Sequence, residues 1–176
     1  MIIGLSGLAG SGKSTVARFL VERRAFVEIS LAAPMKRIVQ DLFAFSDMQL
    51  YGPSSARNDV DPRYGVSPRH VLQTLGTDWG RACWPDVWVS RVIRQAAEYP
   101  AVVVPDCRFK NELAAIRAAG GKLWRLTHGR GLDGAAGAHE SEREQLGIPD
   151  DYFDRVFAHD STLAELEDAV IRSLDT

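Results

Sequence analysis

Residues Gly7-Leu-Ala-Gly-Ser-Gly-Lys-Ser14 match the phosphate-binding loop pattern G-x-x-x-x-G-K-[ST] over its whole length. The loop follows an apolar run, 2–6, that is typical of a buried strand. It precedes a stretch, 16–21, in which apolar residues predominate as in a packed helix. A strand, this loop and a helix in that order form the context in which the motif binds phosphate. The sequence therefore predicts a strand–loop–helix unit here.

The chemistry of this loop follows from its backbone. The glycines at 7, 10 and 12 carry no Cβ, so the chain can curl with its N–H groups turned inward and approach phosphate oxygens closely. The next helix presents the positive end of its dipole to the same anion. Lys13 adds a mobile charge for the outer phosphates, and the Ser14 hydroxyl is placed to ligate Mg²⁺. We therefore predict that ATP and Mg²⁺ bind here, at Gly10, Ser11, Gly12, Lys13, Ser14 and Thr15.

Five short strand-like runs alternate with helix-like stretches along the chain. The runs 2–6 and 101–104 are almost wholly apolar, as expected of central strands that helices cover on both faces. Ser67-Pro68 and the capping box Thr162-Leu-Ala-Glu165 predict helix starts, and Gly120-Gly121 predicts a helix end. This βαβα order predicts an α/β fold with a five-stranded parallel sheet flanked by helices. The other predicted strands are 26–30, 122–127 and 155–158.

Two segments interrupt this order. Residues 31–98 are too long for one crossover connection, and their loop 46–66 is rich in Gly, Pro, Ser, Asp and Arg. Residues 128–140 are rich in glycine. We expect a single domain with a core formed by 1–30 and 99–176, a helical acceptor-binding insertion at 31–98 and a lid at 128–140. The alternative for the insertion 31–98 is a helical addition without a role in acceptor binding. The alternative for the lid 128–140 is a loop without function.

Composition narrows the classes of function. The chain has 176 residues, the length of one domain, and its 45% hydrophobic and 25% charged residues are typical of a globular protein. The net charge of −2 argues against a nucleic acid partner. Two cysteines, Cys83 and Cys107, are too few for a disulfide framework, and no stretch approaches the ~20 apolar residues of a membrane helix. With no signal-peptide pattern either, we expect small-molecule substrates, no membrane partner and a cytoplasmic location.

A second candidate site lies where the strand 101–104 ends. Asp106 follows that strand, and ligands gather at the carboxyl ends of parallel strands. We expect its carboxylate on the metal side or on the acceptor side of the site. Arg108 comes two residues later, and its planar guanidinium suits bidentate phosphate binding, with a surface ion pair as the alternative. The predicted catalytic residues are therefore Lys13, Asp106 and Arg108, and the predicted metal ligands are Ser14 and Asp106.

The stretch 72–81 gathers amide, hydroxyl, carboxylate, indole and guanidinium groups in one helical stretch. This mixture suits a pocket that binds a base and a phosphate. Gln73, Arg81 and the preceding Arg69 belong either to such a pocket or to a solvated helix face. Trp79 and the later Trp88 either stack on a base or pack in the core, and the core is favoured for both.

Several separated patches resemble the phage-type deoxynucleoside monophosphate kinases, a group of P-loop nucleoside monophosphate kinases. The most specific patches are Gln73-Thr-Leu-Gly-Thr-Asp-Trp-Gly-Arg81 and Asp106-Cys-Arg-Phe-Lys-Asn-Glu112. The others are 7–15, 30–36, 64–69, 86–88 and 139–142. The resemblance implies a P-loop kinase fold and transfer of the γ-phosphoryl group of ATP to a deoxynucleoside monophosphate (dNMP).

The resemblance also assigns roles by matching motif. It implies acceptor contacts at Arg69, Gln73, Trp79 and Arg81. We further expect substrate contacts at Lys36, Trp88, Arg130 and His139. His139 is equally well explained as an exposed loop residue. One departure from the family pattern concerns the metal: Pro105 precedes Asp106, so position 105 offers no second carboxylate. Metal positioning is then left to Ser14, Asp106 and water.

Other functions stay open at this point. A P-loop kinase for another small acceptor, such as a nucleoside or a coenzyme precursor, would share the same loop. A nucleotide-binding switch with slow turnover is an alternative from a different class, although the chain has no guanine-reading Asn-Lys-x-Asp segment. The resemblance places the protein in the host cytoplasm if it is phage-encoded, and a homodimer is an open expectation.

Overall fold

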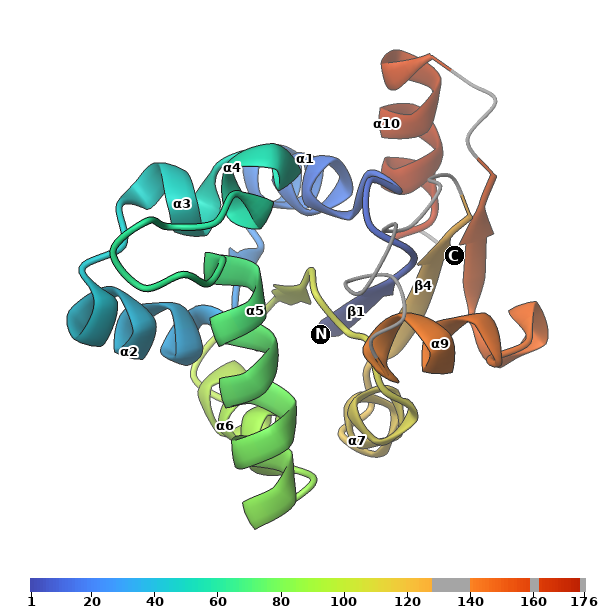
Figure 1. Ribbon diagram of the computed structural model, residues 1–176. Coiled ribbons are helices and arrows are strands. Elements are labelled where there is room, and N and C mark those ends of the chain that lie inside the picture. The colour runs from blue at the N-terminus through green and yellow to red at the C-terminus, as the bar shows by residue number, and fades with distance from the viewer. Residues whose placement is uncertain (128–139, 159–161, 175–176) are drawn as a thin grey trace. The chain divides into compact units, whose positions relative to one another are not determined.

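The computed structural model describes residues 1–127, 140–158 and 162–174 (Figure 1). The chain falls into two compact units, the first formed by Met1–Leu31 with Val89–Thr176 and the second by Ala32–Trp88. The predicted lid lies outside the described residues except for residue 140. The predicted roles of core, acceptor-binding insertion and lid stay predictions.

The first unit is built on a five-stranded parallel sheet, which confirms the predicted fold class. The strands are β1 (Ile2–Ser6), β2 (Val27–Glu28), β3 (Val102–Val104), β4 (Lys122–Leu126) and β5 (Arg155–Phe157). Their order across the sheet is β2-β3-β1-β4-β5, and every neighbouring pair is parallel. Because β1 is central, the phosphate-binding loop that follows it emerges at the carboxyl edge of the sheet, between the ends of β3 and β4.

Helices cover both faces of this sheet. Those of the first unit are α1 (Lys13–Arg24), α7 (Lys110–Ala118), α9 (Glu140–Leu146), the 3₁₀ turn η2 (Asp150–Tyr152) and α10 (Leu163–Arg172); α6 (Val87–Ala96) begins at the end of the second unit. On one face, Ile3 and Leu5 of β1 share a core with Leu20 of α1 and Val170 of α10. On the opposite face α7 packs so closely that a Cβ on Gly4 would come within 2.9 Å of its Ile116. Because successive side chains of β1 point to opposite faces of the sheet, neighbouring residues pack against different helices.

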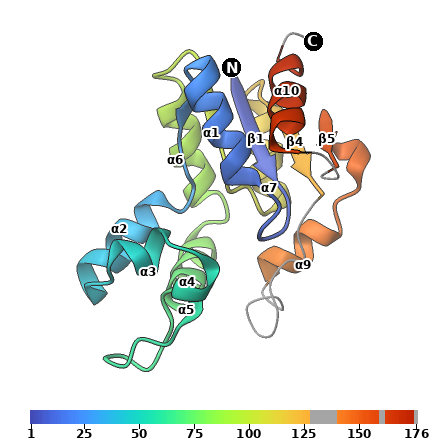
Figure 2. The same cartoon turned by 90° about the horizontal axis from the view of Figure 1, so that it is seen from above.

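The second unit is helical (Figure 2). Its helices are α2 (Ala33–Phe43), α3 (Asp47–Tyr51), α4 (Ser54–Asn58), α5 (Pro68–Gln73) and the π-helix η1 (Thr74–Arg81). Phe45 and Leu50 are fully buried in a small core of its own, on which Leu72 and Leu75 pack. The predicted start of α5 is confirmed, since the Ser67 hydroxyl accepts the His70 N–H at 3.2 Å.

The stretch 74–81 differs from a regular helix, because it is a π-helix of eight residues. Such wide turns are rare and occur frequently at functional sites. The indole N–H of Trp88 donates to the carbonyl oxygen of Gly76 at 2.9 Å. The indole ring occupies the space where a side chain on Gly80 would lie, 2.8 Å from Cε2 of Trp88. Gly80 and Trp88 therefore fit together as one packed pair, which holds the wide turn in place.

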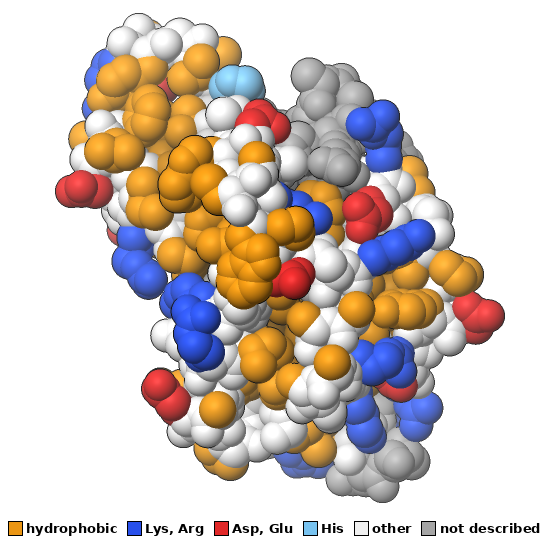
Figure 3. All heavy atoms as spheres, turned by 90° about the horizontal axis from the view of Figure 1, so that it is seen from below, with side chains coloured by type: hydrophobic (Ala, Val, Ile, Leu, Met, Phe, Trp, Pro, Cys, Tyr) orange, Lys and Arg blue, Asp and Glu red, His pale blue; other side chains and the backbone are white. Residues whose placement is uncertain are grey.

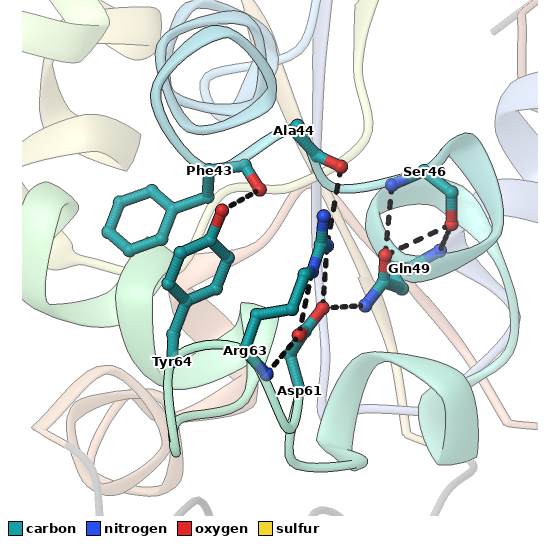
Figure 4. Close-up of polar contacts among 7 residues, drawn as sticks. All are labelled: Phe43, Ala44, Ser46, Gln49, Asp61, Arg63 and Tyr64. Atoms are coloured by element: carbon teal, nitrogen blue, oxygen red, sulfur yellow. Dashed lines mark hydrogen bonds and ion pairs between the residues drawn. The ribbon is translucent and has the colours of Figure 1, made fainter.

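A buried carboxylate orders the loop between α4 and α5 (Figure 4). Asp61 accepts hydrogen bonds from the Arg63 guanidinium at 2.7 and 2.9 Å, and from Nε2 of Gln49 at 2.8 Å. These bonds hold the pKa of Asp61 well below its usual range. Gln49 also accepts the backbone N–H of Ser46 at the start of α3. Asp61 therefore ties this loop to α3.

Charged side chains of both signs lie on the described surface. On the face drawn in Figure 3, lysine and arginine side chains are interspersed with acidic and hydrophobic ones. Among the helices that the structure describes, none combines the length and apolar character needed to cross a membrane.

We predict that Gly80→Ala lowers stability. Alanine favours a helix over glycine by about 1 kcal/mol, but its methyl group would overlap the Trp88 ring, and overpacking of a core costs about 1–3 kcal/mol. The control is Gly147→Ala, whose new methyl group meets only Glu144 O at an ordinary 3.6 Å. Thermal unfolding followed by circular dichroism should show a lower Tm for Gly80→Ala alone. A Gly80→Ala protein at least as stable as the wild type would contradict the packed pair.

We predict that the effect of Asp61→Asn depends on pH. Because the folded-state pKa of Asp61 is lowered, its charge stabilises the fold fully above the unfolded-state pKa of about 3.9. That stabilisation disappears as the pH falls through the folded-state value. The difference in Tm between wild type and variant should be constant from about pH 7 to 5 and shrink at more acidic pH. A difference that stays unchanged down to about pH 2.5 would show that the Asp61 charge is unimportant.

Candidate functional site

The phosphate-binding loop is shaped by glycines in backbone conformations that other residues rarely adopt. Gly7 has φ 146° and Gly12, which caps α1, has φ 93°. A Cβ on Gly7 would overlap the carbonyl oxygen of Leu126 and lie 2.7 Å from Oγ of Ser11. Gly7 therefore lets the loop start in contact with the end of β4, where no larger residue fits.

The N-terminus of α1 is open to an anion. Its N-cap residue, Gly12, has no side chain that could cap it, and its first turn holds no acidic residue. The backbone N–H groups of that turn, together with the helix dipole, form the kind of site that binds phosphate. The predicted loop residues 10–15 lie at this helix start, with Ser11 fully buried and Ser14 exposed.

Lys13 adds its charge to the loop itself. Its Nζ donates to the carbonyl oxygens of Gly7 at 2.5 Å and Leu8 at 2.7 Å, and to Oγ of Ser11 at 3.3 Å. The ammonium group therefore lies over the curved backbone rather than in solvent. This position lets it exchange carbonyl oxygens for phosphate oxygens with a small movement of a flexible side chain.

Asp106, at the carboxyl end of β3, is held by the chain that follows β2. Its Oδ2 accepts the Ser30 hydroxyl at 2.6 Å, and its Oδ1 accepts the backbone N–H of Leu31 at 2.9 Å. Leu31 is the last residue of the first unit before the helical segment. Asp106 thus fixes the point where the chain leaves the sheet, an anchoring role that the sequence does not reveal.

The donor set of the site suits a magnesium ion that is bound mainly through phosphate. The described residues contain no group of three or more His, Cys, Asp or Glu side chains that could hold a metal. Ser14 and Asp106 offer one hydroxyl and one carboxylate. Mg²⁺ is commonly bound by one or two protein oxygens, with substrate phosphates and water completing the octahedron. The residues present therefore fit Mg²⁺ in a nucleotide complex and do not form an all-protein cage.

The loop 106–109 is braced from α7. Oε2 of Glu112 accepts the backbone N–H groups of Arg108 at 2.7 Å and Phe109 at 3.0 Å, so the half-buried Arg108 starts from a fixed backbone. Cys107 is fully buried, and burial raises the pKa of its thiol, with the charges of Glu112 and Asp106 acting in the same direction. The thiol is therefore protonated and structural, which excludes a reactive cysteine here.

In the second unit, two arginines converge on one hydroxyl. Nη2 of Arg69 and Nη2 of Arg57 lie 3.4 Å and 3.5 Å from Oγ of Ser54, and Nε of Arg69 donates to Oδ1 of Asn58 at 2.5 Å. Arg69 is 8% exposed and therefore buried deeply for an arginine. Sequence reasoning selected Arg69 and missed Arg57, because Arg57 lies in a loop-like region with no motif around it.

The other predicted substrate contacts differ in their local partners and in their exposure. Nζ of Lys36 lies 4.2 Å from the centre of the Tyr51 ring, and Arg81 donates to the carbonyl oxygen of Pro85 at 3.3 Å. Gln73 is partly exposed, and Trp79 is 56% exposed, which leaves its indole accessible to a ligand. Trp88 is buried, and its N–H bonds to Gly76, an arrangement that favours packing over base stacking. Arg130 and His139 lie outside the described residues.

Comparison with known proteins agrees with this geometry. No protein-family profile matches the chain. A protein of Acanthamoeba polyphaga mimivirus, named "Putative deoxynucleotide monophosphate kinase", is 32% identical over 99% of this chain and 96% of its own. The matched region covers almost the whole chain and therefore spans both units.

Similar solved structures are P-loop kinases. A gluconokinase from Sinorhizobium meliloti covers 98% of this chain and 90% of its own, with 17% identity and a TM-score of 0.56. Shikimate kinase from Aquifex aeolicus covers 99% and 96%, with 16% identity and a TM-score of 0.53. Dephospho-CoA kinase from Campylobacter jejuni covers 99% and 95%, with 14% identity and a TM-score of 0.52. At these identities the likeness concerns the fold alone. Sequence, fold and phosphate-binding loop together show that this chain belongs to the deoxynucleotide monophosphate kinase family of P-loop kinases.

Proposed function

We propose that this protein transfers the γ-phosphoryl group of ATP to dNMPs, giving deoxynucleoside diphosphates and ADP. The observation that carries the kinase chemistry is the uncapped N-terminus of α1 with Lys13 bonded over the loop before it. The acceptor class is supported by the mimivirus relative. A kinase for another small acceptor would share the loop. It would have no need of the stretch 73–81 in the second unit, which resembles the deoxynucleoside monophosphate kinases.

In this proposal the loop residues bind and orient the donor. The N–H groups at the start of α1 hold the β-phosphate, and Lys13 compensates charge on the outer phosphates. Ser14 and Asp106 would hold Mg²⁺, which neutralises charge across the β- and γ-phosphate oxygens when it is bound. Arg108 offers two parallel N–H groups to the transferring phosphoryl group from the braced loop 106–109. Catalysis is then mainly positioning and electrostatic stabilisation, as in other phosphoryl transfers.

We assign the acceptor phosphate to the paired arginines, Arg57 and Arg69. Two guanidinium groups at the same hydroxyl repel each other, and a dianionic phosphate between them would reverse that repulsion. Burial of Arg69 lowers the local dielectric and strengthens its attraction for an anion. Asn58 orients the Arg69 guanidinium through Nε, and the planar guanidinium group is suited to bidentate contact with a phosphate.

The substrate class is tested by an assay of ADP release across all dNMPs and the matching ribonucleotides. We expect several dNMPs to be accepted and to exceed their ribonucleotides by roughly tenfold to a hundredfold in kcat/KM. A pocket closed against C2′ leaves a hydroxyl buried without a partner, at a cost of about 1–3 kcal/mol. Lys13→Ala serves as the control and should lose on the order of a hundredfold to a thousandfold in rate, because one preorganised donor is removed. Equal rates for deoxy and ribo acceptors would refute the deoxy preference, and normal turnover in Lys13→Ala would refute the mechanism.

The acceptor assignment is tested by Arg69→Lys and Arg57→Lys. Lysine keeps the charge but loses the planar fork, so we expect the KM for the dNMP to rise at least about tenfold, with the KM for ATP changed less than about twofold. Arg37→Lys is the matched control, because Arg37 is an exposed arginine of α2 in the same unit. If KM for ATP and for the dNMP rise together, or if only Tm falls, the two arginines are structural.

A further inference from the structure

The first residue of the phosphate-binding loop is held by a side chain that is remote in sequence. The backbone N–H of Gly7 donates to Oε1 of Gln145 at 3.0 Å, in a buried environment. Gln145 belongs to α9 and is 1% exposed. A buried backbone N–H requires a partner, and here the partner comes from 138 residues further along the chain. The curvature of the loop therefore depends on where α9 lies.

Gln145 is itself held in place by hydrogen bonds from an arginine of the sheet. Arg125, on β4, donates from Nη2 to the backbone oxygen of Gln145 at 2.8 Å. Its Nη1 donates to the carbonyl oxygen of Ile148 and to Oδ1 of Asp150, the latter at 2.9 Å, and its guanidinium stacks on Phe153 with 5.0 Å to the ring centre. The side chain of Arg125 is 13% exposed. One arginine thus locks the end of α9 to the strand beside β1.

The neighbour of Gln145 reaches the other loop of the site. Oε1 of Glu144 accepts the backbone N–H of Lys110 at 2.6 Å, at the start of α7 and directly after the segment that carries Asp106 and Arg108. Two consecutive residues of α9 therefore bond to the two loops that follow β1 and β3. Neither bond would be anticipated from a sequence motif.

We propose that Gln145 is a positioning residue for nucleotide binding, one that sets the curvature of the phosphate-binding loop through Gly7 while Arg125 holds it in place. This inference rests on the proposed nucleotide site at that loop. Without the Gln145 oxygen, the buried Gly7 N–H must find another partner, and the loop must shift to do so. The phosphate-facing N–H groups would then no longer be preorganised, and affinity for the diphosphate of a nucleotide would fall.

The test compares ADP affinity of the full-length protein by titration calorimetry, so it is independent of turnover. Gln145→Met keeps the length of the side chain and removes the acceptor, and we expect the Kd for ADP to rise about tenfold. Arg125→Lys keeps the charge and loses the hydrogen bonds of the guanidinium group, and it should weaken ADP binding in the same direction by about threefold to fivefold. This second variant keeps the inference testable if Gln145→Met does not fold.

Two controls separate positioning from general destabilisation. Val170→Ala opens a cavity in the buried core of α10, away from the loop, and its Tm provides the comparison for stability. Glu144→Gln keeps an oxygen acceptor on α9 for Lys110. Both should bind ADP within about twofold of the wild type. Wild-type affinity for ADP in folded Gln145→Met or Arg125→Lys would overturn this inference but not the proposed nucleotide site. Equal weakening of ADP binding in Val170→Ala would do the same. A wild-type protein that binds no ADP would overturn the proposed nucleotide site as well.

Discussion

The close approach of Gly7 to the end of β4 is the constraint on which the rest of this site depends. A side chain at this position would overlap the carbonyl oxygen of Leu126, so glycine alone allows the loop to turn directly off the central strand. From that turn follow the open start of α1, the burial of Ser11 and the position of Lys13 over the backbone. The parallel sheet supports the turn from both sides, because β3 and β4 flank β1 and end at the same edge.

The two units contribute different chemistry. The first offers backbone N–H groups and one lysine at a helix start, a combination suited to a polyphosphate. The second offers paired guanidinium groups and an exposed indole on a π-helix, a combination suited to a monophosphate with a base. In the second unit, the buried Trp88 bonds to Gly76 of the π-helix and Asp61 orders the loop before α5, so both are structural groups. This contrast supports the proposal that the first unit binds the phosphoryl donor and the second unit binds the acceptor.

The sequence predicted the fold well, because its signals there are local. The loop pattern, the apolar central strands and the Thr162–Glu165 capping box each depend on neighbouring residues, and the structure confirms the parallel sheet and the capping. The π-helix could not be predicted in this way, because no local pattern marks it and its close contact between Gly80 and Trp88 is tertiary. Arg57 and Gln145 escaped sequence analysis for the same reason. Tertiary packing brings Arg69 to the Ser54 hydroxyl beside Arg57 and brings Gln145 to Gly7, and no motif surrounds Arg57 or Gln145.

If this protein is a dNMP kinase, the γ-phosphoryl group of ATP ends on the phosphate of a deoxynucleotide. The most direct measurement follows the label from [γ-³²P]ATP when it is incubated with the protein, Mg²⁺ and each dNMP in turn. We expect label in the β-position of the deoxynucleoside diphosphate, formed in equal amount to ADP and with little free phosphate. Label found only as inorganic phosphate, or on an acceptor other than a nucleoside monophosphate, would contradict it.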